Sequence, residues 1–481
     1  MCDRNTRVSD RAYNEYVRRN RARNPFLKAC STPLHRRLQI VVMSLTVVPV
    51  RLVLIAATTT VAWFYACIIT AGADAKSKKP FGCIRMTLNR GLRYLTRVVI
   101  FCMGVHWITV RGRRVHSRQA PILAVVPHSA WLDVVVFCVG SPTPCPISRF
   151  ENSLVPVIST LGLAAQTLYI RRDDESSRKN AVQAIRDRVR RPGMWPQLII
   201  FPEGTTTNRR QLARFKMGAF QPGAAVQPVH IEFLNSWDTF TWTSENCDDL
   251  PKLVWKTLCQ FGTRVRVTFL PPYEPSAEER QDAVLYTNNF QRYMSDEIQL
   301  PVSMFTSEDS LLMMHARQFG LPPIAGALEF GQLRTECKVS FPEARTLLQE
   351  YAKRSIASKG MLTYEQFIVA FDLPHATITC GLYKLYDRDE KGFMNYRDFV
   401  IGRMTRFQWT RETLTELFKK LSADANLLSV DDLVRLKCPN AANLFHLMTT
   451  PPLTKVSRDD FVSKLKLLPE IASFLEMLVK K

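Results

Sequence analysis

The chain has 481 residues, of which 46% are hydrophobic and 22% charged, and its formal net charge is +22. This length and composition predict several folded domains and exclude collagen, wholesale disorder and a small disulfide-stapled scaffold. The positive charge lies mostly in the first 300 residues, and because no zinc-finger spacing or RNA-binding signature accompanies it, it favours anionic lipid or a phosphate-bearing ligand over nucleic acid.

A basic tail, residues 1–37, precedes an apolar membrane segment, residues 38–73. Within this segment Leu52–Gly72 contains 21 residues without a charge. As a helix this run is roughly 31 Å long, which matches a hydrocarbon core about 30 Å thick. A buried globular helix is the alternative, but so long an apolar run is unusual for one. The sequence therefore predicts an N-terminal membrane helix.

Both flanks of the apolar segment are basic, with a net +7 for residues 1–37 and +6 for residues 73–97. A single span would carry one flank across the membrane, against the positive-inside tendency. We therefore expect a hairpin bent at Pro49–Arg51, or a monotopic helix. The later run Val98–Val110 is too short to span and is expected at the interface.

Residues 74–300 predict an α/β domain, a mixed sheet flanked by helices, because short β-rich runs alternate with helical patterns such as Ser177–Val189 and Pro251–Gln260. Continuous apolar runs such as LIIF are typical of strands covered on both faces. The expected strands are Trp107–Val110, Ile122–Val126, Thr167–Ile170, Leu198–Phe201, Val226–Ile231 and Val265–Leu270.

The sequence VVPHSAWLDVVVF places His128 directly after a strand and Asp133 five residues later. A neutral imidazole is a competent general base at physiological pH, and a carboxylate can fix its tautomer and stabilise the imidazolium. Taken alone, the pair is better interpreted as a hydrogen-bonded histidine at a strand end.

A second polar block, FPEGTTTNRR, again follows a strong strand, 75 residues further on. Ligand sites in open α/β sheets gather at the carboxyl ends of strands, so Glu203 is expected near His128. Gly204 lets the backbone approach a ligand. Arg172 ends the strand QTLYIRR and could grip a phosphate, although it could also be a solvated strand end beside acidic residues.

The succession HSAWLD, YIRR, FPEGTT and VQPV resembles the four ordered blocks of the glycerolipid acyltransferases, which include the 1-acylglycerol-3-phosphate acyltransferases, over roughly residues 100–300. The segments EGTTTNRRQLARFKMGAF, TFTWT and TLCQF resemble the lysophosphatidylcholine acyltransferases. That group also has an N-terminal membrane segment and an EF-hand-like C-terminal region, so the resemblance covers nearly the whole chain.

The resemblance implies an enzyme that transfers a fatty acyl group from acyl-CoA, as co-substrate, to the hydroxyl of a lysophospholipid, with no bound cofactor or metal. His128 would remove the hydroxyl proton and Asp133 would orient His128. The acceptor hydroxyl would attack the thioester directly, without an acyl-enzyme. The substrate-binding residues it implies are Arg172, Glu203, Gly204, Thr205 and Thr206.

Thr206 departs from the phosphatidic-acid-forming relatives, which usually have Arg at that place. A phosphate monoester benefits from an extra cation more than a phosphodiester does. The acceptor is therefore expected to carry a head group, as in lysophosphatidylcholine. Related acceptors remain alternatives: lysophosphatidic acid, lyso-platelet-activating factor or lysophosphatidylethanolamine. So do a thioester or lipid hydrolase and a catalytically silent membrane adaptor.

After an expected linker, residues 301–335, residues 336–481 predict an all-α domain with degenerate EF-hand-like loops. In the loop that begins at Asp387, Gly392 falls at position six, Met394 at eight and Asp398 at twelve. Lys391 replaces the oxygen ligand at position five, so calcium binding is doubtful.

An earlier loop with Ser355 and Gln366 at its ends lacks carboxylate ligands, and segments ending at Asp432 and Asp460 would be further eroded copies. The helical region is expected to serve packing or a protein partner. The resemblance implies an endoplasmic reticulum membrane protein, with Golgi or lipid droplets as alternatives, and the catalytic domain is expected on the cytosolic side.

Overall fold

In the computed structural model the described residues form two compact units, Arg23–Ser307 and, together, Met1–Ala22 with Glu308–Lys481. The residues described are 10–28, 32–73, 79–140, 142–171, 175–243, 249–373, 377–387, 390–404, 411–424, 426–436, 438, 441–442, 445, 455–467, 472 and 475. The first unit ends at Ser307, close to the expected domain end at residue 300.

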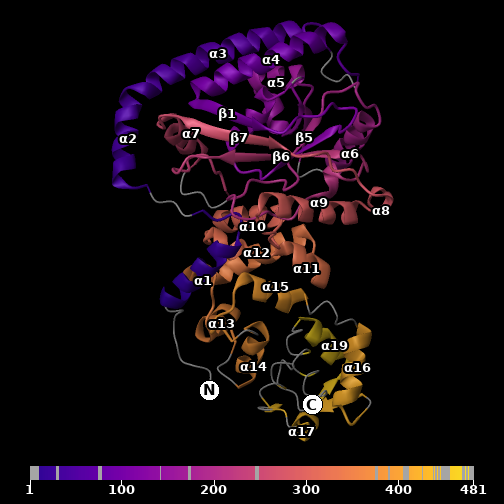
Figure 1. The fold of residues 1–481 in the computed structure, drawn as a ribbon. Coiled ribbons are helices and arrows are strands. Elements are labelled where there is room, and N and C mark those ends of the chain that lie inside the picture. Colours follow the sequence, from indigo (N-terminus) through magenta and orange to yellow (C-terminus); the bar gives the residue numbers. More distant parts are fainter. Residues whose placement is uncertain are drawn as a thin grey trace. The chain divides into compact units, whose positions relative to one another are not determined.

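The larger unit is built on a seven-stranded mixed sheet in the order β1-β7-β6-β2-β5-β3-β4 (Figure 1). Only the β6–β7 pairing is antiparallel, which confirms the expected mixed sheet. The strands are β1 (Val105–Arg111), β2 (Ile122–Val126), β3 (Cys145–Arg149), β4 (Leu168–Ile170), β5 (Leu198–Ile200), β6 (Val226–Phe233) and β7 (Thr263–Phe269).

Each face of the sheet has its own apolar core. Leu123 and Val125 of β2 pack on one face with Ile100 of helix α4, whereas Ile122, Ala124 and Val126 join a second core on the other. Strand β2 is wholly buried, so its continuous apolar sequence follows from being covered on both sides. The helices of this unit are α2 (Leu34–Leu45), α3 (Val47–Thr70), α4 (Cys83–Cys102), α5 (Pro156–Ala164), α6 (Glu175–Val189), α7 (Leu250–Leu258), α8 (Ala277–Gln281) and α9 (Ala283–Ile298), with short 3₁₀ turns η1 (Trp131–Cys138), η2 (Phe150–Leu154) and η3 (Met217–Ala219).

Helix α3 is the one helix in the described part of the chain that is long and apolar enough to cross a membrane. It is not bent at Pro49–Arg51 as expected: the break lies at Thr46, and Pro49 is tolerated because it lies in the first turn. Arg51 is buried and donates to the carbonyls of Gln260 (2.7 Å) and Phe261 (3.1 Å). The run Val98–Val110 is not one interfacial segment, because α4 ends at Cys102 and β1 begins at Val105.

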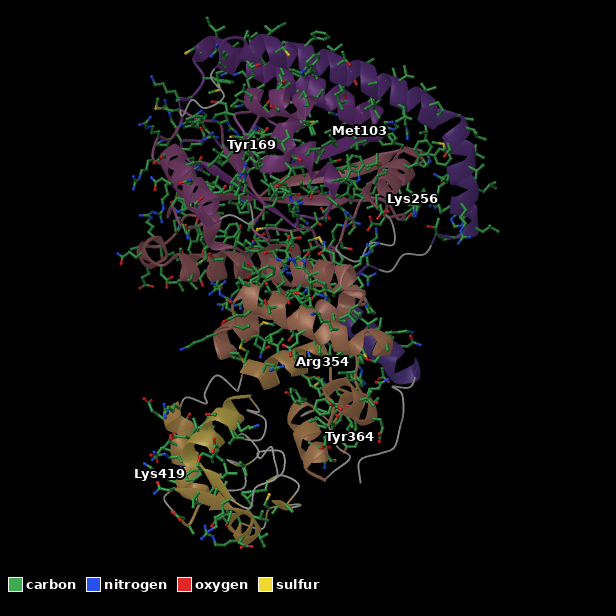
Figure 2. All side chains as sticks on the ribbon, turned by 180° about the vertical axis from the view of Figure 1, so that it is seen from behind. Met103, Tyr169, Lys256, Arg354, Tyr364 and Lys419 are labelled. Atoms are coloured by element: carbon green, nitrogen blue, oxygen red, sulfur yellow. The ribbon has the colours of Figure 1, made fainter. Side chains whose placement is uncertain are left out.

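The N-terminal helices are joined to the sheet by shared packing. Met103, labelled in Figure 2, contacts both the core of one sheet face and a cluster that contains Met43 and Val48 of α2 and α3. Tyr65 of α3 donates to the Leu88 carbonyl of α4 at 2.8 Å, and in Figure 1 the two helices lie side by side.

The smaller unit is mainly helical, with one two-stranded sheet, so the expectation of an all-α domain is wrong in that detail. Residues 301–335, expected to be a linker, instead include two helices whose Leu312, Phe330 and Leu333 are buried in a core. The described elements are α1 (Asp10–Arg23), α10 (Ser307–Gln318), η4 (Pro323–Gly326), α11 (Phe330–Cys337), α12 (Phe341–Ser355), η5 (Ile356–Ser358), α13 (Tyr364–Phe371), α14 (Thr377–Tyr386), α15 (Tyr396–Met404), α16 (Arg411–Leu421), β8 (Leu427–Ser429), α17 (Val430–Arg435), β9 (Lys455–Ser457) and α19 (Arg458–Leu467).

Two pairs of loops in this unit face each other through short antiparallel contacts. Leu362 and Met394 exchange backbone hydrogen bonds of 2.9 and 2.8 Å. Leu428 pairs with Val456 between β8 and β9 in the same way. Gly360 and Gly392 have φ of +80° and +81°, which glycine adopts without strain.

Candidate active site

His128 and Asp133 form a hydrogen-bonded pair at the carboxyl end of β2. The distance from His128 Nδ1 to Asp133 Oδ2 is 2.7 Å. The same oxygen accepts the backbone N–H groups of Ser129 (2.8 Å) and Ala130 (3.0 Å). Asp133 is the third residue of the turn η1, so its carboxylate folds back onto the backbone that precedes the turn. The five-residue spacing thus gives direct contact between imidazole and carboxylate.

The orientation of the imidazole leaves Nε2 as the nitrogen available to a substrate. Nδ1 faces the carboxylate, which favours the tautomer with the proton on Nδ1. The ring stacks on Phe201, with centroids 3.9 Å apart and planes at 26°. The His128 side chain is 23% exposed and the Asp133 side chain 2%. A base that solvent reaches and a buried orienting carboxylate are the arrangement that general base catalysis requires.

Glu203 lies directly behind His128, although 75 residues separate them. Its Oε1 accepts the His128 backbone N–H at 2.7 Å and its Oε2 accepts that of Ala213 at 3.0 Å. The residue is fully buried. Burial raises the pKa of this carboxyl to about 8, against the opposing effect of its hydrogen bonds. In this structure Glu203 therefore holds the backbone at His128 and at Ala213, and its assignment to substrate binding stays a prediction.

The residues after Glu203 turn back toward His128. Gly204 has φ of +67°, and its N–H donates to the Phe201 carbonyl at 3.0 Å. Thr205 and Thr206 are partly exposed in this turn, as a substrate contact would require. Thr207 then donates its backbone N–H to the His128 carbonyl at 2.7 Å. The two polar blocks predicted from sequence thus meet through the main chain on both sides of His128.

Arg172 lies outside the described residues. Its neighbour Arg171 places its guanidinium 4.0 Å from the ring centroid of Phe150, which follows β3. Strands β3 and β4 are paired in parallel, so this stack holds together the carboxyl ends of both.

Sequence reasoning missed the third segment of the site, around Asp238. Its carboxylate pairs with Arg209 (2.8 Å) and Lys28 (3.3 Å), and these cations hold the pKa of Asp238 well below its usual value although burial opposes them. Asp238 Oδ1 also accepts the N–H of Thr241 at 3.0 Å. The next residue, Trp242, donates its N–H to the Ser129 carbonyl at 3.0 Å. Only the sequence TFTWT pointed here, and only through the resemblance.

No cluster of three or more His, Cys, Asp or Glu side chains that could hold a metal occurs among the described residues. Asp387 begins the expected EF-hand-like loop, and its two carboxylate oxygens accept the backbone N–H groups of Lys391 and Gly392, each at 2.8 Å. The Lys391 ammonium lies 3.1 Å from Asp398. The ammonium of Lys391 thus neutralises the carboxylate of Asp398, which a calcium ion would do in a standard EF-hand loop.

Comparisons with known proteins identify relatives of this chain. Residues 107–232, which include both blocks, match the family model described as Acyltransferase. The chain is 37% identical to lysophosphatidylcholine acyltransferase 2 of Mus musculus over 79% of this chain and 70% of that protein. It is 32% identical to lysophosphatidylcholine acyltransferase 1 of Homo sapiens, over 83% and 75% of the two chains, and 31% identical to that of Danio rerio, over 93% and 88%.

Among solved structures, the 1-acyl-sn-glycerophosphate acyltransferase PlsC of Thermotoga maritima aligns with 54% of this chain and 98% of its own, with 15% identity and a TM-score of 0.35. A TM-score of this size does not establish a common fold.

Proposed function

The chain belongs to the lysophosphatidylcholine acyltransferase family, and from this premise we propose that it transfers a fatty acyl group from acyl-CoA to the free hydroxyl of a lysophospholipid, with lysophosphatidylcholine as the favoured acceptor. The observation that carries the proposal is the 2.7 Å contact between His128 and Asp133 at a strand end framed by the Pro-Glu-Gly-Thr turn. A catalytically silent adaptor has no need of this arrangement.

In the proposed reaction His128 Nε2 takes the proton of the acceptor hydroxyl as its oxygen attacks the thioester carbonyl. A tetrahedral intermediate forms, the carbon–sulfur bond breaks, and the departing CoA sulfur takes the proton from the imidazolium. Asp133 remains ionised throughout and stabilises the imidazolium. The substrate supplies the nucleophile, so no acyl-enzyme and no bound cofactor are required.

Thr205, Thr206 and Arg172 are proposed to contact the glycerophosphate part of the acceptor. The partly exposed turn that contains both threonines supports this, since it is tied to the catalytic histidine through Thr207. Glu203 is proposed to act on the substrate indirectly, through the backbone it holds.

Labelled acyl-CoA incubated with a mixture of lysophospholipids tests the proposal. Labelled phospholipid, formed fastest from lysophosphatidylcholine, is the expected product. Labelled free fatty acid would show a hydrolase, and no turnover would leave an adaptor. The His128→Ala variant serves as the blank, since it lacks the base but keeps the Glu203 contact, which uses the backbone of residue 128.

We also propose that helix α3 lies along the membrane surface rather than crossing it alone. Within the larger unit, Arg51 near the start of α3 is hydrogen-bonded to the Gln260 carbonyl after α7, and Tyr65 near its end to the Leu88 carbonyl of α4. A helix held at both ends against one body cannot leave it to span the bilayer. The opposite side is apolar and exposed, which fits insertion into one leaflet. The large exposed apolar residues of α2, α3 and α4 are Leu34, Leu38, Val41, Val42, Leu45, Val50, Leu52, Val53, Leu54, Val61, Phe64, Ile68, Ile84, Tyr94, Val98 and Phe101.

Such an apolar surface predicts retention on microsomal membranes in high salt and in carbonate, with the endoplasmic reticulum as the proposed location. Protease added to intact microsomes should then digest the catalytic domain if it faces the cytosol. Release by salt alone would show that the attachment is electrostatic and that the apolar surface serves another purpose.

The smaller unit is proposed to be an EF-hand-like region that does not depend on calcium. Its paired loops, with glycines of positive φ and a backbone contact between Leu362 and Met394, support this proposal. The ammonium of Lys391 beside Asp398 opposes binding of a divalent cation. Packing or recruitment of a protein partner is its proposed role.

A further inference from the structure

A five-residue segment that precedes the membrane helices, Asn24–Lys28, is built into the catalytic unit. Asn24 and Phe26 are fully buried and Leu27 is 2% exposed. Asn24 Oδ1 accepts the Phe26 N–H at 2.8 Å, which closes a tight turn. The segment lies well before residue 107, where the match to the acyltransferase family model begins.

Asn208 binds this segment through its backbone N–H and its side-chain nitrogen. Its backbone N–H donates to the Pro25 carbonyl at 2.7 Å, and its side-chain nitrogen donates to the carbonyls of Asn24 (3.1 Å) and Leu27 (2.9 Å). Its Oδ1 accepts the N–H of Arg210 at 3.0 Å, so the amide orientation is fixed.

Thr207, the residue before Asn208, links this contact to His128. Thr207 and Asn208 are consecutive, and their N–H groups bind the His128 and Pro25 carbonyls at the same distance of 2.7 Å. A displacement of the segment therefore reaches His128 through two hydrogen bonds and one peptide unit.

The other end of the segment reaches the loop that binds the two residues after His128. Lys28 pairs with the Asp238 carboxylate at 3.3 Å and donates to the Asp238 carbonyl at 3.1 Å. Asp238 begins the stretch in which Thr241 pairs with Ala130. The segment thus contacts both loops that flank the catalytic turn, one through Asn208 and one through Lys28.

We propose that Asn24–Lys28 is a clamp that fixes the spacing of these two loops, and that Asn208 and Lys28 are positioning residues for His128. This inference rests on the proposed acyltransferase function. It makes the part of the chain next to the membrane helices a component of the catalytic site. Because misplacing a catalytic group by about 1 Å can cost 10²-fold in rate, release of the clamp should lower kcat rather than substrate affinity.

Asn208→Asp is the sharpest variant, because it keeps the shape and the acceptor for Arg210 but turns an oxygen toward two carbonyls. Asn235 offers a matched control. Its side-chain nitrogen also donates twice, to Gln260 and to the Gly262 carbonyl (2.8 Å), and its oxygen accepts a backbone N–H at 2.9 Å. Asn235→Asp therefore also turns an oxygen toward two acceptors, but none of these bonds is to Asn24–Lys28, Thr207 or His128.

With acyl-CoA and lysophosphatidylcholine, Asn208→Asp is expected to lower kcat by 10- to 100-fold while both KM values stay within about threefold. Asn235→Asp should cause a similar loss of thermal stability and keep kcat within about threefold. Lys28→Met should lower kcat, and Lys28→Arg, which retains the ion pair, should recover most of it. Amide exchange in residues 128–131 should rise in Asn208→Asp and not in Asn235→Asp.

Equal kcat values for the two aspartate variants, or a rise in KM with kcat kept, would refute the clamp while wild-type turnover leaves the acyltransferase proposal standing. A wild-type protein that does not transfer acyl groups would overturn both.

Discussion

Replacing Asp133 by Asn separates the charge of this carboxylate, proposed to act in catalysis, from its geometry. All three hydrogen bonds that Asp133 accepts, from His128, Ser129 and Ala130, end on Oδ2. The other oxygen is buried and has no hydrogen-bond partner among the described residues. An asparagine with its carbonyl in place of Oδ2 can therefore keep the three hydrogen bonds and the position of the ring. What it cannot keep is the negative charge beside the imidazolium.

The size of the effect follows from the 2.7 Å separation of Nδ1 and Oδ2. With an effective dielectric constant of about 20, two unit charges at that distance attract by about 6 kcal/mol, which is an upper bound. The imidazolium charge is delocalised and the amide carbonyl still accepts the N–H, so we take about half, roughly 3 kcal/mol. At 1.36 kcal/mol for each factor of ten, kcat should fall by about 150-fold.

The assay is steady-state transfer from acyl-CoA to lysophosphatidylcholine, with thermal unfolding measured in the same detergent. Asp133→Asn should keep both KM values and unfold within a few degrees of the wild type. Asp133→Ala should also lose stability, because the N–H groups of Ser129 and Ala130 are then buried without an acceptor. Asp309→Asn is the matched control: Asp309 is buried and accepts the N–H groups of Leu328 and Phe330, but lies in the other unit.

A kcat for Asp133→Asn within about fivefold of the wild type would refute the reasoning, since it would show that the charge of the carboxylate does not lower the barrier. A large and equal loss in Asp309→Asn would show instead that buried aspartates matter only for folding.

Three further changes have defined expectations. Because burial raises the pKa of Glu203 to about 8, the stability that this carboxyl contributes is fully present below about pH 4.5 and is lost by about pH 8. The destabilisation caused by Glu203→Gln should therefore shrink over that range by up to about 1.4 kcal/mol per pH unit. A difference in melting temperature between variant and wild type that is constant with pH would contradict this. Thr206→Arg should raise kcat/KM for lysophosphatidic acid relative to lysophosphatidylcholine by at least about 10-fold, because the arginine can form a charge-assisted hydrogen bond to the monoester phosphate. An unchanged ratio of the two kcat/KM values would show that Thr206 does not select the acceptor. Lys391→Asp should create calcium binding with a Kd on the order of 10⁻⁴ M in titration calorimetry, because it removes the ammonium that neutralises Asp398. The wild type should show no binding, and a micromolar Kd for the wild type would contradict a calcium-independent loop.

The elements that the sequence predicted well are those in which one physical signal dominates. Strand β2 was predicted at its observed bounds, Ile122–Val126, because burial on both faces demands an unbroken apolar run. Strand β3, Cys145–Arg149, was missed: its sequence CPISR contains a proline and an arginine, and most of its residues are only partly buried. The helices within residues 301–335 were missed because their apolar residues are separated by polar and proline-containing stretches that are typical of a linker.

The candidate site divides in the same way. The expected proximity of His128, Asp133 and Glu203 is observed, since Asp133 bonds the His128 ring and Glu203 bonds its backbone N–H. Residues that bind main-chain carbonyls, such as Asn208 and Thr207, could be interpreted only as polar loop residues. A hydrogen bond to a carbonyl leaves no trace in side-chain type, because every residue has a carbonyl.

This division explains why the N-terminal segment was not predicted to be part of the site. Pro25 contributes only its carbonyl, and proline is normally interpreted as a turn or a helix stop. Phe26, fully buried against Phe305 with ring centroids 6.4 Å apart, would pass for an ordinary core residue. Yet the two N–H groups of Thr207 and Asn208 bind one carbonyl on each side, so the carbonyl of His128 and that of Pro25 are held by the same two residues. In this proposal the position of His128 depends on the distant segment Asn24–Lys28, although no side chain of that segment is hydrogen-bonded to His128.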